Sequence, residues 1–132
     1  MFKIRNFIWI LTTIVMSMML LGCSADEVIR VGTPYNYKGT DGVKFDTEIT
    51  NSEAISKLRT IINHSKEIEK PDGIENLADV YFSLDRPKEG IGEIVRYMWY
   101  QDDGSSILSS GDYYYTLTKE QTGELKGILE GK

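Results

Sequence analysis

Cys23 is the residue best placed for a specific chemical event, because it is the only cysteine of the chain. A single thiol cannot form an intramolecular disulfide, and it leaves no second thiolate for a metal site. Cys23 follows Leu20-Leu21-Gly22 at the end of a long apolar run, and the first acid, Asp26, comes after it. A small residue before a cysteine at this point is typical of an export signal that ends at a lipidation site.

Other residues that could take part in chemistry lack the partners they would need. His64, the only histidine, falls on the charged face of a predicted helix, so we expect a solvated surface residue rather than a general base. Asp102 and Asp103 precede Gly104 in a pattern typical of a tight hairpin, and the spaced ligands of a calcium loop do not follow. The chain shows no Gly-x-Ser-x-Gly motif, metal-ligand spacing or phosphate loop. The sequence therefore indicates neither an enzyme nor a cofactor.

The segment before Cys23 has the layout of a cleaved signal. Lys3 and Arg5 precede an uncharged run from Phe7 to Leu21. As a helix, this run would reach roughly 22 Å, which is short of the ~30 Å hydrocarbon core of a bilayer. We therefore expect residues 1–22 to be a signal peptide, with an uncleaved single-span anchor and an ordinary secretory signal as the alternatives.

In these residues the chain resembles bacterial lipoproteins, whose lipobox ends at an acylated cysteine. Leu20 and Gly22 match that pattern well, whereas Leu21 is a less common occupant of its position. The resemblance implies that Cys23 becomes the first mature residue and carries a diacylglyceryl thioether and, in some hosts, an N-acyl chain. It also implies a lipid anchor at the outer face of the cell membrane, for which two acyl chains suffice. Residues 23–27 would then be the lipidated cysteine and a short tether.

The mature chain is acidic. Without Lys3 and Arg5 it has 13 basic residues against 20 acidic ones, so the net charge moves from −5 to −7. This charge argues against nucleic acid as a partner. A length of about 110 residues suits one small domain with one hydrophobic core.

Hydrophobic periodicity predicts a single α+β domain over residues 28–132. We expect about five or six mainly antiparallel strands, with two helices packed on one face of the sheet. Residues 32–42, rich in glycine, are predicted to be a loop. The predicted strands are 28–31, 43–50, 80–84, 94–100, 106–110 and 113–117. The predicted helices run from about 50 to 70 and from 118 to about 130, and begin at the capping-box pairs Thr50 with Glu53 and Thr118 with Gln121.

Aromatic residues gather in the second half of the domain. The set that we single out is Tyr81, Tyr97, Trp99 and Tyr114. These rings could complete a small core and clamp cross-strand pairs. They could instead lie on an open sheet face and serve as contact anchors for a membrane protein or a cell-wall polymer. The sequence leaves both alternatives open.

The layout from Ala78 through the Asp103-Gly104 hairpin to the helix start at Leu117-Thr118 resembles the small uncharacterised YhfM-like lipoproteins of Bacillus-type bacteria. This resemblance implies a membrane-anchored protein and carries no catalytic residue over. We therefore expect a non-enzymatic binding or accessory module at the cell envelope. An inhibitor or stress-related envelope factor that acts by protein contact is the alternative, and a small hydrolase comes last.

Overall fold

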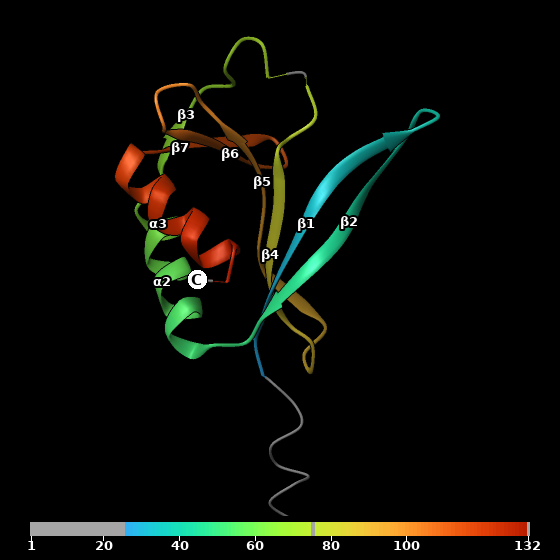
Figure 1. The fold of residues 1–132 in the computed structure, drawn as a ribbon, viewed down its shortest axis with the longest axis vertical. Coiled ribbons are helices and arrows are strands. Elements are labelled where there is room, and N and C mark those ends of the chain that lie inside the picture. Colours follow the sequence, from blue (N-terminus) through green and yellow to red (C-terminus); the bar gives the residue numbers. More distant parts are fainter. Residues whose placement is uncertain (1–25, 75, 132) are drawn as a thin grey trace, which may run out of the picture.

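The computed structural model describes residues 26–74 and 76–131. Within these residues the chain forms seven strands and two helices (Figure 1). In chain order they are β1 (Val28–Tyr37), β2 (Thr40–Ile49), α2 (Ser52–Asn63), β3 (Lys66–Ile68), β4 (Val80–Arg86), β5 (Ile91–Tyr100), β6 (Ser106–Ser110), β7 (Tyr113–Leu117) and α3 (Lys119–Leu129).

The strands form one sheet in the order β2-β1-β4-β5-β6-β7-β3, and every neighbouring pair is antiparallel. Both helices cover the same face of this sheet (Figure 1). The predicted α+β class and the one-sided placement of the helices are confirmed, but the sheet has seven strands rather than five or six. The additional strand is β3, which occupies residues that we predicted to be the end of the first helix.

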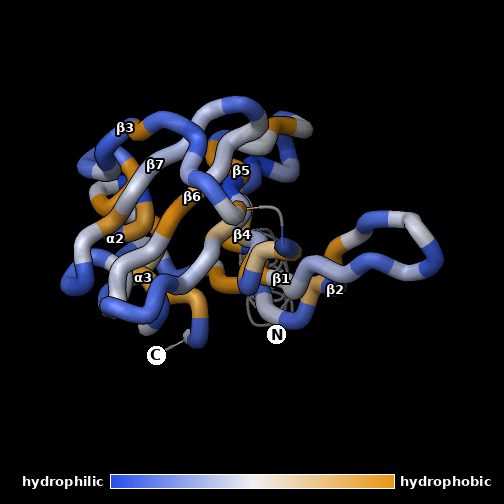
Figure 2. Tube along the Cα trace, turned by 90° about the horizontal axis from the view of Figure 1, so that it is seen from above, coloured by the Kyte–Doolittle hydropathy of each residue, from blue (hydrophilic) through white to orange (hydrophobic). Residues whose placement is uncertain are grey.

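The first hairpin differs most from the prediction. Residues 32–42 were expected to form a loop, but β1 continues to Tyr37 and pairs with β2 up to Thr40. The turn places Lys38 and Gly39 at φ values of 51° and 82°, which is the pattern of a tight hairpin. Pro34 is tolerated because β1 pairs with β4 only as far as Gly32, so beyond that point the strand needs hydrogen bonds on one side only. The result is a two-stranded arm, mostly hydrophilic, that projects from the sheet (Figure 2).

The helix starts follow capping chemistry, with one correction. The N-cap of α2 is Asn51 rather than Thr50, and its side-chain oxygen accepts a hydrogen bond of 3.0 Å from the backbone N–H of Ala54. The capping box of α3 is confirmed, with reciprocal bonds between Thr118 and Gln121 of 2.9 and 3.2 Å. His64 is exposed at the end of α2, as predicted.

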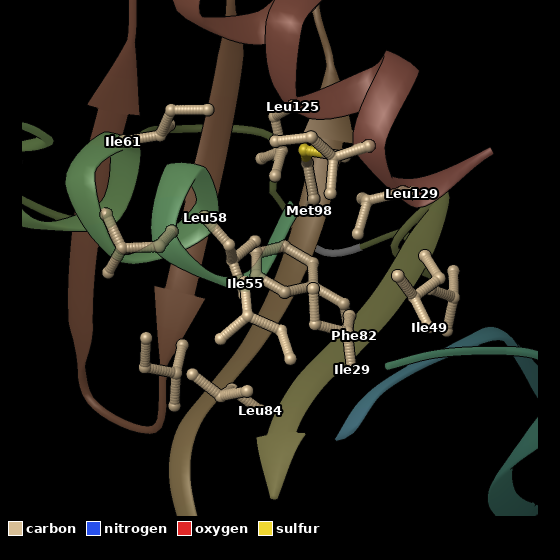
Figure 3. Close-up of a cluster of buried hydrophobic side chains, with 14 of the residues drawn as sticks. Ile29, Ile49, Ile55, Leu58, Ile61, Phe82, Leu84, Met98, Leu125 and Leu129 are labelled. Carbon is tan, nitrogen blue, oxygen red and sulfur yellow. The ribbon is translucent and has the colours of Figure 1, made fainter. Parts of the chain in front are cut away.

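The core lies between the helices and the sheet (Figure 3). Alternate residues of β4 and β5 point toward the helices, and Phe82, Leu84 and Met98 are fully buried there. The apolar stripe of α2 meets them, because residues three and four apart share one helix face. The buried residues of the two helices are Ile55, Leu58, Ile61, Ile62, Leu125, Ile128 and Leu129, together with the polar Thr122.

Two glycines weaken α3, and their replacement should stabilise the domain. A Cβ atom at Gly123 or Gly127 would meet nothing within 4 Å. Because glycine costs up to about 1 kcal/mol relative to alanine inside a helix, we expect each change to alanine to raise the free energy of unfolding by about that amount. Urea denaturation measures the effect. As a control, Gly131→Ala also enters open space but has a φ of +75°, so it should destabilise. Equal effects at the three positions would contradict this account.

Candidate functional site

Cys23, the predicted lipidation site, lies outside the described residues, which begin at Asp26. The four aromatic residues singled out from the sequence all lie on the sheet face opposite the helices. Their neighbours in the strands show this. Each member of the set is next in sequence to Phe82, Met98 or Tyr115, and these three residues belong to the core or pack against it. Tyr97 is 38% exposed, and the other three are half-buried.

The structure brings two of the four into direct contact. The rings of Tyr81 and Tyr97 pair across β4 and β5 at 5.1 Å, edge to face, and Phe45 of β2 adds a third ring at 5.6 Å from Tyr81. Tyr114 lies in the same cross-strand row but is separated from Tyr97 by Ser109. Trp99 lies in another row, where its indole N–H donates to the backbone oxygen of Asn76 at 3.0 Å. A contact role for this face stays a prediction.

A pocket of about 430 Å³ lies between the β1–β2 hairpin and α3. Its volume falls within the range of small-molecule sites in proteins. Tyr100 lines this pocket and also two neighbouring pockets of about 310 and 320 Å³. We therefore call the first one the Tyr100 pocket. The Tyr100 pocket is lined by Val31, Gly32, Thr33, Asp46, Thr47, Val80, Tyr100, Lys126, Leu129 and Glu130.

A β-bulge places Asp46 at this pocket. Val31 pairs with Thr47 and the next residue, Gly32, pairs with Phe45, so Asp46 is the extra residue of β2. Bulges re-aim side chains and are frequent next to functional sites. The hydroxyl of Thr47 donates to Oδ1 of Asp46 at 2.9 Å. The carboxylate of Asp46 is therefore exposed at the Tyr100 pocket, and the Thr47 hydroxyl holds one of its two oxygens.

Tyr100 and Lys126 supply hydrogen-bond donors to the same pocket. The ammonium of Lys126 lies 5.3 Å from the centre of the Tyr100 ring, a distance at which a cation is attracted to the ring face. Burial raises the pKa of the Tyr100 phenol above its ordinary value, and the nearby carboxylates of Glu130 and Asp79 raise it further. The phenol therefore stays protonated at neutral pH and can donate a hydrogen bond.

The Tyr100 pocket has a neighbouring pocket along α3. The pocket of about 310 Å³ on the far side of Tyr100 and Lys126 shares both residues with it and extends to Lys119 and Thr122. The two pockets thus have Tyr100 and Lys126 in common as lining residues.

Asp46, Tyr100 and Lys126 were not singled out from the sequence. The alternating pattern over 43–50 placed Asp46 on the same face as Lys44 and Glu48. The bulge shifts this register, so that Glu48 pairs with Arg30 and Lys44 with Thr33, which lie on opposite faces of β1. Tyr100 was predicted as one face of a central strand, and Lys126 is an ordinary helix residue. No spacing in the sequence links the three, because their proximity arises from the packing of α3 against the sheet.

Two kinds of feature are not seen in the described residues. Among residues 26–74 and 76–131, no three or more histidine, cysteine, aspartate or glutamate side chains are grouped so that they could hold a metal ion. Neither of the two helices in this part of the chain is long and apolar enough to cross a membrane.

The chain was compared with known proteins. No protein-family model matches it, and no curated protein does. Among solved structures, it is similar to the crystal structure of a thioesterase-like protein from Clostridium sporogenes ATCC 15579, with a TM-score of 0.55 and 21% sequence identity. The match covers 76% of this chain and 91% of that one. At this identity the likeness is evidence about the fold.

This likeness corrects the functional expectation drawn from the sequence. We expected a non-enzymatic binding or accessory module, with an inhibitor or stress-related factor as the alternative, and that expectation is contradicted, because the fold is shared with a protein described as thioesterase-like. The statement that the chain is not an enzyme also loses its basis, since a fold shared with a protein described as thioesterase-like does not support it.

Proposed function

We propose that the chain is a small hydrolase of acyl esters or thioesters and that the reaction takes place in the Tyr100 pocket. The observation that carries the proposal is the bulge that places the Asp46 carboxylate in a pocket lined also by the Tyr100 phenol and the Lys126 ammonium. Hydrolysis of such a bond needs a base for water and positive or donor groups for the developing oxyanion. The fold of a thioesterase-like protein adds support.

The proposed reaction assigns one role to each of these groups. The carboxylate of Asp46 removes a proton from a water molecule, whose oxygen attacks the carbonyl carbon of the substrate. The Lys126 ammonium and the Tyr100 hydroxyl stabilise the negative charge on the carbonyl oxygen. When the carbon–sulfur or carbon–oxygen bond breaks, the protonated Asp46 returns its proton to the leaving thiolate or alkoxide. The products are a carboxylic acid and a thiol or alcohol, with no net change in the enzyme.

We also propose that this domain is held at the outer face of the cell membrane by acyl chains on Cys23. The support comes from the sequence: the positive start, the apolar run and the residues before the cysteine. The membrane is thus the partner that we propose. The kinship with YhfM-like lipoproteins is part of the same proposal.

The activity test uses the purified chain with a series of p-nitrophenyl esters and acyl-coenzyme A thioesters of increasing acyl length. We expect turnover, and we expect Asp46→Asn to lower kcat by about 100-fold or more, which is the usual contribution of a general base. The amide keeps the size of the side chain and its acceptor oxygen for the Thr47 hydroxyl. Nitrophenolate absorbance and a thiol reagent measure the two reactions.

The matched control is Asp112→Asn, which removes an exposed carboxylate in the β6–β7 turn. It should leave kcat unchanged, and circular dichroism should show the same fold for both variants. Two results would refute the proposal: no turnover of any ester or thioester by the unmodified chain, or a fully active Asp46→Asn variant.

A further inference from the structure

Ion pairs fix the start of the domain to the β4–β5 hairpin and to α2. The ammonium of Lys88 lies 2.8 Å from Oδ1 of Asp26, the first described residue. One residue on, the carboxylate of Glu27 lies 2.7 Å from the guanidinium of Arg59 on α2. Two consecutive residues are thus bound to two different elements, so the chain enters the domain in a defined place.

A second set of ion pairs makes the hairpin and the helix one unit. Glu93 lies 2.7 Å from Arg59 and also contacts Arg86, which begins the hairpin turn. Because Glu93 is the extra residue of a bulge in β5, its carboxylate reaches both arginines. Arg59 thereby joins the entry of the chain to the hairpin through Glu27 and Glu93. Networks of this kind hold orientation better than isolated surface pairs.

From this geometry we propose that the turn of the β4–β5 hairpin, residues 87–90, together with Ile91 at the start of β5, is the surface that faces the lipid bilayer. This inference rests on the proposed acylation of Cys23. Cys23 precedes Asp26 by three residues, which span at most about 10 Å when fully extended. Asp26 is itself held against Lys88 of this turn. The turn must therefore lie close to the headgroups whenever the acyl chains are inserted.

The chemistry of the turn fits a lipid headgroup layer rather than a strongly charged partner. Ile91 is 53% exposed and offers apolar surface. Lys88 is engaged with Asp26, and Arg86 with Glu89 and Glu93, so the positive charges are largely matched by negative ones. The position is thus set by the short tether together with the ion pairs that hold Asp26 and Glu27.

The opposite end of the domain points away from the membrane in this arrangement. The tip of the β1–β2 hairpin lies at the far end of the molecule from the β4–β5 turn (Figure 1). β1 begins beside the tether and runs ten residues outward, which corresponds to roughly 33 Å. Tyr37 at its end is 66% exposed and provides a distant reference position.

The test measures the accessibility of single cysteines in native membranes. In the processed protein the thiol of Cys23 would be blocked by its thioether, so Ile91→Cys and Tyr37→Cys each provide one free thiol in the full chain. Membranes that contain each variant are treated with a bulky polyethylene-glycol maleimide before and after solubilisation in detergent. We expect labelling at position 91 to be slower by about fivefold in membranes, and labelling at position 37 to be unchanged.

Each outcome decides a separate point. Equal labelling at position 91 in membranes and in detergent would overturn the proposed orientation. If the protein is not in the membrane fraction, or if Cys23→Ala leaves it there with unchanged size, the anchor itself is refuted. The double change Arg59→Gln and Lys88→Gln, checked for folding by circular dichroism, should weaken the protection at position 91. Full protection in that variant would overturn the role of the ion pairs. Ester hydrolysis by the detergent-solubilised protein tests the proposed activity, and its result does not depend on the anchor or on the orientation at the membrane.

Discussion

Phe82→Ala is expected to lower the free energy of unfolding by about 3–5 kcal/mol, the range found for removal of a buried aromatic ring. Phe82 has no exposed surface and lies in the centre of β4, where the helices and the sheet meet (Figure 3). The loss combines the transfer free energy of the ring with the cost of the cavity that remains. Denaturant unfolding at pH 7, followed by circular dichroism, measures this change.

Phe45→Ala is the matched control, because it removes the same side chain from the opposite face. Phe45 is 53% exposed, and its main contact is the ring of Tyr81. We expect a loss of about 1 kcal/mol, which corresponds to one aromatic pair. Similar losses for the two variants would mean that the uncovered face of the sheet contributes as much to stability as the core does.

Gly32→Ala is expected to lower the free energy of unfolding by about 1–3 kcal/mol and to lower hydrolytic activity as well. A Cβ atom at this position would lie 2.6 Å from a methyl group of Val43 and 2.8 Å from the backbone oxygen of Lys44. The Val43 side chain could rotate away from the added methyl group, but the backbone oxygen of Lys44 cannot. β1 and β2 must therefore separate. Gly32 pairs with Phe45 next to the bulge at Asp46 and lines the Tyr100 pocket. Separation of the strands should therefore displace the proposed base.

Gly42→Ala tests whether a close contact alone is sufficient. Its Cβ atom would lie 2.5 Å from the Tyr35 ring, but the three nearest atoms all belong to the far end of that exposed side chain, which can move. We expect a change in stability within about 0.5 kcal/mol and normal activity. The unfolding midpoints and kcat values of the Gly32→Ala and Gly42→Ala variants are compared side by side. A Gly32→Ala variant with normal stability and kcat would show that β1 and β2 do not constrain the site.

The elements with the strongest periodicity could be predicted from the sequence. Alternation in β4 correctly assigned Phe82 and Leu84 to one face, because a one-residue shift would expose them to solvent. The Thr118–Gln121 capping box located the start of α3 because capping depends on residues close in sequence. The α+β class followed from these local signals, whereas the predicted count of five or six strands was too low, because the sheet has seven.

The candidate site could not be predicted, because it depends on irregular pairing and distant contacts. The bulge at Asp46 arises from the register of β1 against β2, which periodicity does not encode. The contact between Tyr100 and Lys126 joins a strand to a helix through tertiary packing. Similarly, Pro34 and the neighbouring glycines indicated a loop, although a two-stranded arm accommodates them.

The outer side of β2 has a consequence for the behaviour of the protein at high local concentration. In the described part of the chain, β2 ends the sheet and is ten residues long, so its free backbone groups could template the addition of a strand from another molecule. Lys44, Asp46 and Glu48 place charges along this strand, and the bulge at Asp46 interrupts its regular hydrogen-bonding pattern. Charges and bulges of this kind oppose edge-to-edge aggregation. The same irregularity that directs Asp46 to the pocket therefore also keeps neighbouring copies from joining into a continuous sheet.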